Sequence, residues 1–249
     1  MNLEELLSEC TFERVTPTLL EQCEPFACGH DDLDEFFRSD YKLYADKLLG
    51  KTYAFRLIDN PSKIVSIFTL SNDAIRIKQL VAEDKEQIEY VTENGEKNLR
   101  RFPGVLIGRL GTNQTLSRKG YGTAVMDFIK AWFRSNENKT GCRFIIVDAH
   151  NNPDTIRYYE KNGFQFLYSE EINEAKSMGL NIKRPNTLPL NTRLMYFDLI
   201  KSALTNNHAH FPHHYISAQK NPEWKDSGFF CVYFVGVLAE EGEEIGRDG

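Results

Sequence analysis

The feature that most constrains the fold is an apolar stretch, a glycine loop and an amphipathic segment in direct succession. The stretch "GVLIGRL" (104–110) predicts a buried strand, and "LSRKGYGTAV" (116–125) follows it with two basic residues and two glycines. Apolar residues then recur at helical spacing and predict one face of a helix: Val125, Phe128, Ile129, Trp132 and Phe133. A strand, a loop and a helix in this order predict a mixed α/β domain.

The glycine loop does not fit two familiar phosphate-binding motifs. A P-loop has its lysine after the last glycine, whereas Lys119 precedes Gly120, and a dinucleotide-binding loop needs a third glycine where Val125 stands. The loop does combine flexible backbone, a helix N-terminus and the charges of Arg118 and Lys119, which together suit a diphosphate. A tight turn into a packed helix would use the same residues, so the loop alone does not decide between the two.

The segments before the loop predict an antiparallel sheet with helices. We expect a strand over 10–15, a helix over 29–50 and a hairpin over 51–73, followed by a polar helix over 82–95. Asp31 or Asp32 can cap the helix over 29–50, and Gly50 can end it. Its apolar residues are expected near one face: Leu33, Phe36, Phe37, Tyr44 and Leu48.

After the loop the same alternation continues. We expect a buried strand over 143–149 and a short helix over 152–163, with Pro153 in its first turn and Gly163 past its end. Strands over 164–168 and 192–199 enclose a polar excursion at 170–192, which is either a loop or an ordered insertion. Beyond residue 199 we expect one more strand at 229–239 and a disordered acidic tail.

Composition narrows the function classes. The formal net charge of −6 argues against a general affinity for nucleic acid, because phosphate binding needs clustered Lys and Arg. No secretory signal or membrane-spanning stretch is evident, and five cysteines without a CxxC pair predict reduced thiols in a cytoplasmic protein. The histidines of "HAHFPHH" (208–214) suggest a solvated loop rather than a metal site, and Arg100–Arg101 suggests a solvated pair rather than a contact to a polyanion.

Some thirty residues after the loop, "TIRYYEKNGFQFL" (155–167) adds a second motif. With the strand, loop and helix before it, this stretch resembles the GNAT superfamily of acyl-CoA-dependent N-acetyltransferases. The family loop Q/R-x-x-G-x-G/A is similar to Ser117-Arg-Lys-Gly120-Tyr-Gly122, with serine in place of glutamine or arginine. The family element Tyr-x3-Gly-Phe is matched from Tyr159 to Phe164.

Further stretches resemble one branch of the superfamily, the acetyltransferases of bacterial toxin–antitoxin pairs. They are "PFACGHDDLDEFF" (25–37), which resembles the branch's F-x-C-G-x-x-x-L-D-x-F opening, and "FPGVLIGRLGTNQTL" (102–116). The resemblance covers residues 11–199, which we expect to be the acetyltransferase domain. It leaves residues 200–249 as a C-terminal extension.

The resemblance implies a GNAT fold, with a mixed and mostly antiparallel sheet that is splayed between two parallel strands, here 105–112 and 143–149. Acetyl-CoA would lie in that opening as cosubstrate, and no metal is implied. Its pantetheine arm would pair with Leu110, Gly111 and Thr112, and Asn151 would reach it from the loop after the second strand. The diphosphate would be held by the backbone of Arg118, Lys119, Gly120, Tyr121, Gly122 and Thr123.

The same resemblance makes Tyr159 the general acid that protonates the departing CoA thiolate, and Tyr158 stands one residue away from the family position. The general base stays open among Glu83, Asp148, Asp154, Glu160 and a water chain. The acceptor is an amine of unknown identity. In the toxin branch it would be aminoacyl-tRNA, with an antitoxin as protein partner, although the net charge of −6 disfavours tRNA. A CoA-binding module without catalysis and a purely structural α/β domain are the rival interpretations.

Overall fold

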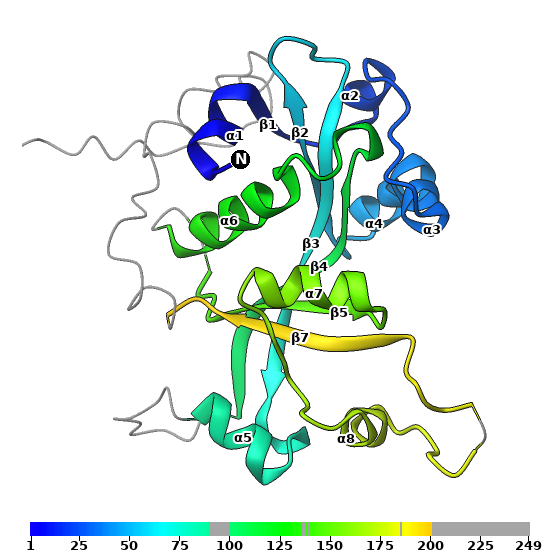
Figure 1. The fold of residues 1–249 in the computed structure, drawn as a ribbon, viewed down its shortest axis with the longest axis vertical. Coiled ribbons are helices and arrows are strands. Elements are labelled where there is room, and N and C mark those ends of the chain that lie inside the picture. The colour runs from blue at the N-terminus through cyan, green and yellow to red at the C-terminus, as the bar shows by residue number, and fades with distance from the viewer. Residues whose placement is uncertain (90–99, 136–137, 139, 185, 201–249) are drawn as a thin grey trace, which may run out of the picture. The chain divides into compact units, whose positions relative to one another are not determined.

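The computed structural model describes residues 1–89, 100–135, 138, 140–184 and 186–200 (Figure 1). Within these ranges the chain forms one sheet in the order β1-β2-β3-β4-β5-β7-β6. The strands are β1 (Cys10–Arg14), β2 (Lys51–Leu57), β3 (Ile64–Arg76), β4 (Arg101–Thr112), β5 (Phe144–His150), β6 (Gln165–Phe166) and β7 (Thr192–Asp198). The helices are α1 (Leu3–Glu9), α2 (Pro17–Glu21), α3 (Asp31–Glu35), α4 (Tyr41–Asp46), α5 (Ala82–Glu89), α6 (Tyr121–Arg134), α7 (Pro153–Lys161) and α8 (Glu171–Ser177).

The strands β4 and β5 form the one parallel pair among the described strands, and they pair over a short length. Residues 104–107 of β4 pair with residues 144–147 of β5, and the register ends there. Beyond it, β4 continues to Thr112 along β3, while β5 continues to His150 along β7. The predicted mixed, mostly antiparallel sheet with a splayed parallel pair is therefore confirmed.

A β-bulge in β4 accounts for the splay. Thr69 of β3 pairs with Arg109, and the next residue, Leu70, pairs with Ile107, so Gly108 is an extra residue without a partner. A bulge bends its strand and increases the local twist. The bend comes directly after Ile107, the last residue of β4 that pairs with β5. The sheet therefore opens at the point where β4 turns away.

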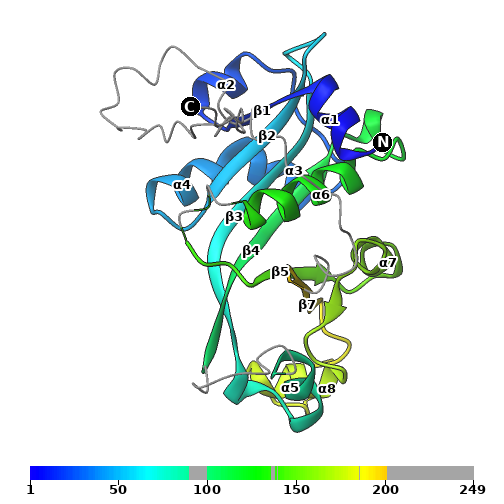
Figure 2. The same ribbon diagram turned by 90° about the vertical axis from the view of Figure 1, so that its left-hand side faces the viewer.

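Helices α6 and α7 cover one face of the sheet, which we call the α6 face (Figures 1 and 2). Phe128 and Trp132 of α6 pack against Phe12 of β1, with ring centroids 4.6 and 5.1 Å apart. The predicted helical stripe of α6 is thus confirmed as the side that packs on the sheet. Large aromatic rings packed together supply much of the apolar area that holds a helix on a sheet.

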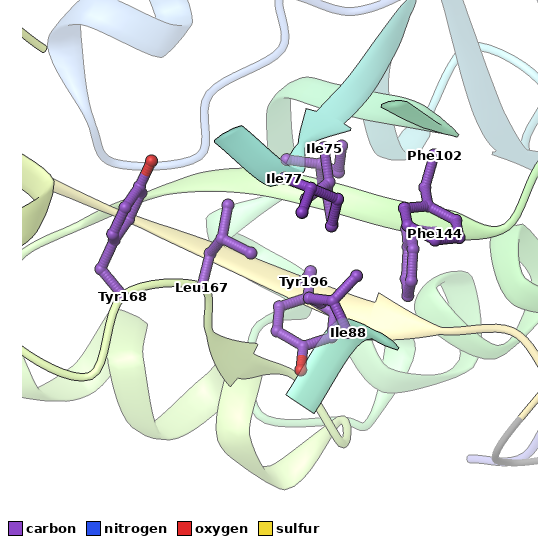
Figure 3. Close-up of a cluster of buried hydrophobic side chains, with 9 residues drawn as sticks. Ile75, Ile77, Ile88, Phe102, Phe144, Leu167, Tyr168 and Tyr196 are labelled. Atoms are coloured by element: carbon purple, nitrogen blue, oxygen red, sulfur yellow. The ribbon is translucent and has the colours of Figure 1, made fainter. Parts of the chain in front are cut away.

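The opposite face, which we call the α3 face, is covered at its two ends. At one end Phe36, Phe37 and Tyr41 pack with Ala54 and Ile67 of β2 and β3. At the other end α5 and the segment after β6 enclose a second cluster, made of Ile75, Ile77, Ile88, Phe102, Phe144, Ile146, Leu167, Tyr168 and Tyr196 (Figure 3). Between the two clusters, Gly108 and Asp148 are exposed.

The helix predicted over 29–50 differs from the expectation in three ways. It is broken into α3, a π-helical turn over 36–40 and α4, and its N-cap is His30 rather than Asp31 or Asp32. It ends at Asp46, and Leu48, with φ 56° and 90% exposed, lies off the apolar face. Gly50 has a packing role instead, because a Cβ there would lie 2.9 Å from Thr69 Cγ2.

Two other predicted elements are shorter than expected. The strand over 164–168 is reduced to Gln165–Phe166, because Leu167 and Tyr168 leave the sheet to join the second cluster. The helix over 82–95 is confirmed up to Glu89, and its remainder lies outside the described residues. The polar excursion contains the helix α8. The strand at 229–239, the histidine cluster and the acidic tail also lie outside the described residues.

The crossing of β4 and β5 gives a test of the sheet geometry. A Cβ on Gly104 would lie 2.8 Å from Ile146 Cδ1 and 2.9 Å from the Phe144 carbonyl oxygen, so Gly104→Ala must displace backbone. We expect it to lower the free energy of unfolding by about 1–3 kcal/mol in a denaturant titration.

Gly108→Ala is the matched control in the same strand, because a Cβ there would have the Thr69 carbonyl oxygen as its nearest neighbour, at 4.0 Å. It should change stability by less than about 1 kcal/mol. Equal losses in the two variants would contradict the close approach at Gly104.

Candidate active site

The glycine loop lies where β4 leaves the sheet and α6 begins. Asn113 fixes its start: its backbone N–H donates to the Val65 carbonyl at 2.8 Å and its Nδ2 to the Ile64 carbonyl at 3.0 Å. Gly120, with φ 90°, is the N-cap of α6, and Arg118 also adopts a left-handed conformation, with φ 62°. The loop therefore turns sharply before the helix, which requires glycine at residue 120.

The turn leaves a row of backbone donors free. None of the N–H groups of residues 118–123 donates a hydrogen bond to another described residue. The side chains of Ser117, Arg118 and Lys119 are exposed, and neither basic side chain has an ion pair within the described ranges. Free amides at a helix N-terminus beside two cations form a site for an anion. The sequence-predicted residues of this loop are thus brought together.

Tyr121 belongs to the loop through its backbone only. Its hydroxyl donates to Glu9 Oε2 of α1 at 2.8 Å, so its side chain points away from the free amides. Burial and the neighbouring Glu9 raise the pKa of this phenol, which therefore stays protonated.

The three predicted residues at the end of β4 lie beside the opening. Leu110, Gly111 and Thr112 pair with β3 on one side and have no register with β5 on the other. Gly111 is buried, and a Cβ there would come within 3.2 Å of Phe26 and Cys28. An extended ligand could add to this free strand edge by backbone hydrogen bonds.

The two neighbouring tyrosines of α7 have different surroundings. The Tyr158 hydroxyl donates to the Gly122 carbonyl at 2.8 Å and so ties α7 to the start of α6. Tyr159 packs against Tyr158 and Phe164 with ring centroids 5.1 and 5.3 Å away, and its hydroxyl makes no hydrogen bond to any described residue. Burial, with a smaller effect of Asp148, raises the pKa of Tyr159. Of the two phenols, Tyr159 has its proton available.

Asn151, predicted to contact the cofactor, is held by the protein. Its Nδ2 donates to Glu171 Oε1 at 2.9 Å and to the Leu190 carbonyl at 2.8 Å. Both hydrogens of the side-chain amide are therefore used to join the loop after β5 to α8 and to the segment before β7. This arrangement favours a structural role for the Asn151 amide nitrogen.

Of the four carboxylates considered as bases, Asp148 lies at the opening. It follows Val147, the last residue of β5 that pairs with β4. Desolvation and the charge of Asp73 raise its pKa, and Asp148 in turn raises the pKa of Tyr159. The sequence singled out neither Asp73 nor this coupling, because the two carboxylates are brought together only by the sheet.

Two further features near the opening were missed by sequence reasoning. His150, at the end of β5, lies 4.9 Å from His30 between ring centroids, and the Arg109 guanidinium sits 3.9 Å from the Phe36 ring centre. The signal for His150 was its place at the end of a predicted buried strand. Within the described residues, no three metal-binding side chains are grouped to hold an ion.

A buried ion pair holds α8 against β7, the strand next to β5. Glu174 of α8 accepts from Arg193 Nε at 2.7 Å and from the Leu194 N–H at 2.6 Å, and Arg193 also donates to the Tyr168 carbonyl at 2.9 Å. Removing one partner of such a pair leaves a buried charge unpaired. The pair therefore fastens α8 and Tyr168 to β7.

Comparison with known proteins agrees with this geometry. Residues 77–166 match the family model of the acetyltransferase (GNAT) domain, a range that contains the glycine loop and both tyrosines of α7. No curated protein gives a significant match. Among solved structures, AtaT complexed with acetyl-methionyl-tRNAfMet has a TM-score of 0.55 and 16% identity, over 79% of this chain and 99% of that one.

Two more solved structures give the same result. A tyrosine-to-phenylalanine mutant of KacT has a TM-score of 0.53 at 17% identity, over 80% of this chain and 99% of that chain. AtaTR bound with AcCoA has a TM-score of 0.52 at 16% identity, over 80% and 98%. At such identities the likeness establishes the fold.

The splayed sheet and the glycine loop thus give the chain a GNAT-like fold. By the family match, residues 77–166 are a GNAT acetyltransferase domain, as the sequence motifs predicted. In the described part of the chain, no helix is both long and apolar enough to cross a bilayer.

The hydrogen bond from Tyr158 of α7 to Gly122 of α6 can be tested for its contribution to stability. Tyr158→Phe removes the hydroxyl that satisfies the Gly122 carbonyl, so it should lower the free energy of unfolding by about 1–2 kcal/mol. Tyr44→Phe is the control, because the Tyr44 hydroxyl has no hydrogen bond to a described residue, and we expect it to change stability by less than about 0.5 kcal/mol. Similar losses of unfolding free energy for both variants in a denaturant titration would show that the Tyr158–Gly122 hydrogen bond does not stabilise the fold.

Proposed function

We propose that this protein transfers the acetyl group of acetyl-CoA directly to an amine. The observation that carries the proposal is the row of free amides at 118–123 next to the open edge of β4. Tyr159, on the helix that Tyr158 ties to the start of α6, has a hydroxyl with no hydrogen bond to a described residue. A diphosphate, an amide-containing arm and a thioester follow one another in acetyl-CoA in the same order.

The chain's own residues fit this cosubstrate. The amides of 118–123, with Arg118 and Lys119 beside them, would hold the diphosphate, and the backbone of 110–112 would pair with the amides of the pantetheine arm. Acetyl-CoA supplies the activated acetyl group as a thioester. The CoA requirement and reduced thiols suit a cytoplasmic enzyme, with residues 11–199 as its catalytic domain and residues 200–249 as an extension.

The transfer needs two proton movements. An ammonium acceptor first loses one proton, and its nitrogen then attacks the thioester carbonyl carbon. The C–N bond forms, the C–S bond breaks and the electron pair leaves on sulfur. The nitrogen sheds a second proton as the amide forms, and this proton balances the one that the thiolate gains.

Tyr159 supplies the donor for the sulfur. Burial holds its pKa above the ordinary value of about 10, while a thiol leaves with a pKa near 8.5. A phenol with the higher pKa stabilises the developing thiolate chiefly as a hydrogen-bond donor, and any phenolate formed regains its proton from the solvent. The second proton of the nitrogen is released to the solvent, or it is taken up by the Tyr159 phenolate if one has formed.

Tyr159→Phe tests this role. The variant keeps the ring contacts with Tyr158 and Phe164 but loses the donor, so kcat should fall by about 10²–10³-fold in an assay of thiol release. Acetyl-CoA should still raise the thermal stability of the variant as it does that of the parent, because the loop is intact.

Tyr158→Phe is the matched control for chemistry: it removes the bond to the Gly122 carbonyl and leaves Tyr159 in place, so we expect kcat to fall by less than about tenfold. An unchanged rate in Tyr159→Phe would refute the donor role. Stabilisation by acetyl-CoA with no turnover in the parent protein would favour a CoA-binding module without catalysis, and no stabilisation would favour a structural domain.

A second candidate, acetylation of aminoacyl-tRNA with an antitoxin as protein partner, is favoured by an exposed basic strip. Arg76 and Arg101 stand opposite each other in β3 and β4, and Lys78 and Arg100 flank them. None of the four has an ion pair with a described residue. The strip offers local positive charge despite the net charge of −6. Such a cluster suits a polyanionic acceptor, and AtaT, which has a similar fold, has been solved in complex with acetyl-methionyl-tRNAfMet.

Replacing Lys78, Arg100 and Arg101 by alanine tests this candidate. Acetylation of aminoacyl-tRNA should weaken by about tenfold or more, and its dependence on salt should become shallower. Transfer to a small amine should be unchanged, because the strip contacts only the polyanion. A parent protein that acetylates small amines but no aminoacyl-tRNA would exclude this acceptor.

A further inference from the structure

A cavity of about 200 Å³ opens on the α3 face of the sheet. Its apolar lining comes from three strands and the segment after β6, chiefly Ile75, Ile146, Leu167 and Leu194, with Tyr168 at one side. Figure 3 shows Leu167 and Tyr168 on one side and Ile75 and Ile77 on the other. The cavity lies on the face opposite to α6 and the glycine loop, so acetyl-CoA does not account for it.

The register of β5 and β7 leads from the cavity to the opening. Ile146, which lines the cavity, and Asp148 are two residues apart, so their side chains share one face of the sheet. Leu194, which also lines it, is the cross-strand partner of Asp148. A group seated between Ile146 and Leu194 would therefore have its near end at Asp148, where β4 and β5 part.

The two acids on this path have no cation paired with them: Arg76 also lines the cavity, but it makes no ion pair with either Asp73 or Asp148. Asp148 makes no ion pair or hydrogen bond with a described residue, and Asp73, on the cavity rim, accepts only the N–H of the adjacent Ala74. The two carboxylates repel each other enough to raise the pKa of Asp148. Glu174, the third acid that faces Asp148, is already neutralised by Arg193. A bound ammonium would supply the missing positive charge.

We propose that this cavity is the acceptor site, which takes a primary amine carrying a medium-sized apolar side chain, with the side chain on Ile146 and Leu194 and the ammonium on Asp148. The assignment rests on the proposed acetyl transfer. Asp148 then accepts the first proton of the ammonium, and the freed nitrogen faces the thioester from the side opposite to Tyr159. Asp73 acts through its field on Asp148, which makes it a positioning residue.

The test compares three amines that differ only in their side chain: glycinamide, leucinamide and phenylalaninamide. With the full chain and saturating acetyl-CoA, we expect kcat/KM for leucinamide and phenylalaninamide to exceed that for glycinamide by about tenfold or more. Binding of the three amines to the CoA-bound protein, measured by calorimetry, should follow the same order.

Leu194→Phe fills the cavity and should remove the preference for leucinamide, and stabilisation by acetyl-CoA equal to that of the parent protein shows that the variant is folded. Leu194→Met keeps the volume and should keep the preference. A parent protein that treats all three amines alike, or a Leu194→Phe variant that still prefers leucinamide, would overturn the proposal and leave acetyl transfer standing. Selective binding of leucinamide without any transfer would support the cavity and refute the proposed function instead.

The roles of Asp148 and Asp73 can be tested by the pH dependence of the rate. The rate of the parent protein should rise with pH through the pKa of Asp148, because the base must be ionised, and Asp148→Asn should lose this acid limb with all three amines. Asp73→Asn removes the like charge and should shift the limb to lower pH. An acid limb that is unchanged in both variants would show that Asp148 is not the base.

Discussion

The bulge at Gly108 is the constraint on which the site depends. One unpaired residue in β4 turns the strand away from β5 after only four paired residues on each, and everything proposed for catalysis lies along the resulting gap. A sheet that stayed paired to Thr112 would have no free edge for a pantetheine arm and no passage from one face to the other. The bulge is stable because β3 and β7 continue to pair with the outer edges of both strands.

The opening also separates two kinds of chemistry. The α6 face carries the free amides, the cations of the loop and the phenol of Tyr159, which suit an anionic ligand and a leaving group. The α3 face carries Asp73 and Asp148 beside an apolar cavity, which suit a cation with an apolar arm. The net charge of −6 hides this division, because it averages the basic strip at Arg76 and Arg101 with the acids near the opening.

The sequence predicted the parts of the fold that are decided locally. The stripe from Val125 to Phe133, Pro153 at the start of α7 and Gly163 after its end all act within a few residues, and all were confirmed. The bulge could not be predicted, since it is a difference of register between two strands. The same holds for Leu48, which the helical period placed in the core although the chain turns left-handed at that residue.

The residues of the candidate site also differ in whether they are close together in the sequence. Residues of the loop are consecutive, so motif spacing identified them, and the role of Tyr159 stays a prediction. Asp73, Asp148 and Leu194 are more than 40 residues apart from one another, and only the sheet makes them neighbours. Glu174 was in the stretch predicted as a loop or an ordered insertion, and Arg193 was in the strand predicted after it. Their pairing was not predicted, because two charges that neutralise each other on burial are indistinguishable in sequence from two exposed ones.

The hydrogen bond from Tyr158 to the Gly122 carbonyl has one more consequence. It joins the helix that bears Tyr159 to the first turn of the helix that follows the glycine loop, so it helps to hold the two ends of the proposed cosubstrate site at one distance from each other. The distance between the loop and the Tyr159 phenol would then have to match the length of the pantetheine arm. At the proposed site, the acyl donor would be selected by the distance from its diphosphate to its thioester, and the size of the acyl group would be limited only by the open space between β4 and β5.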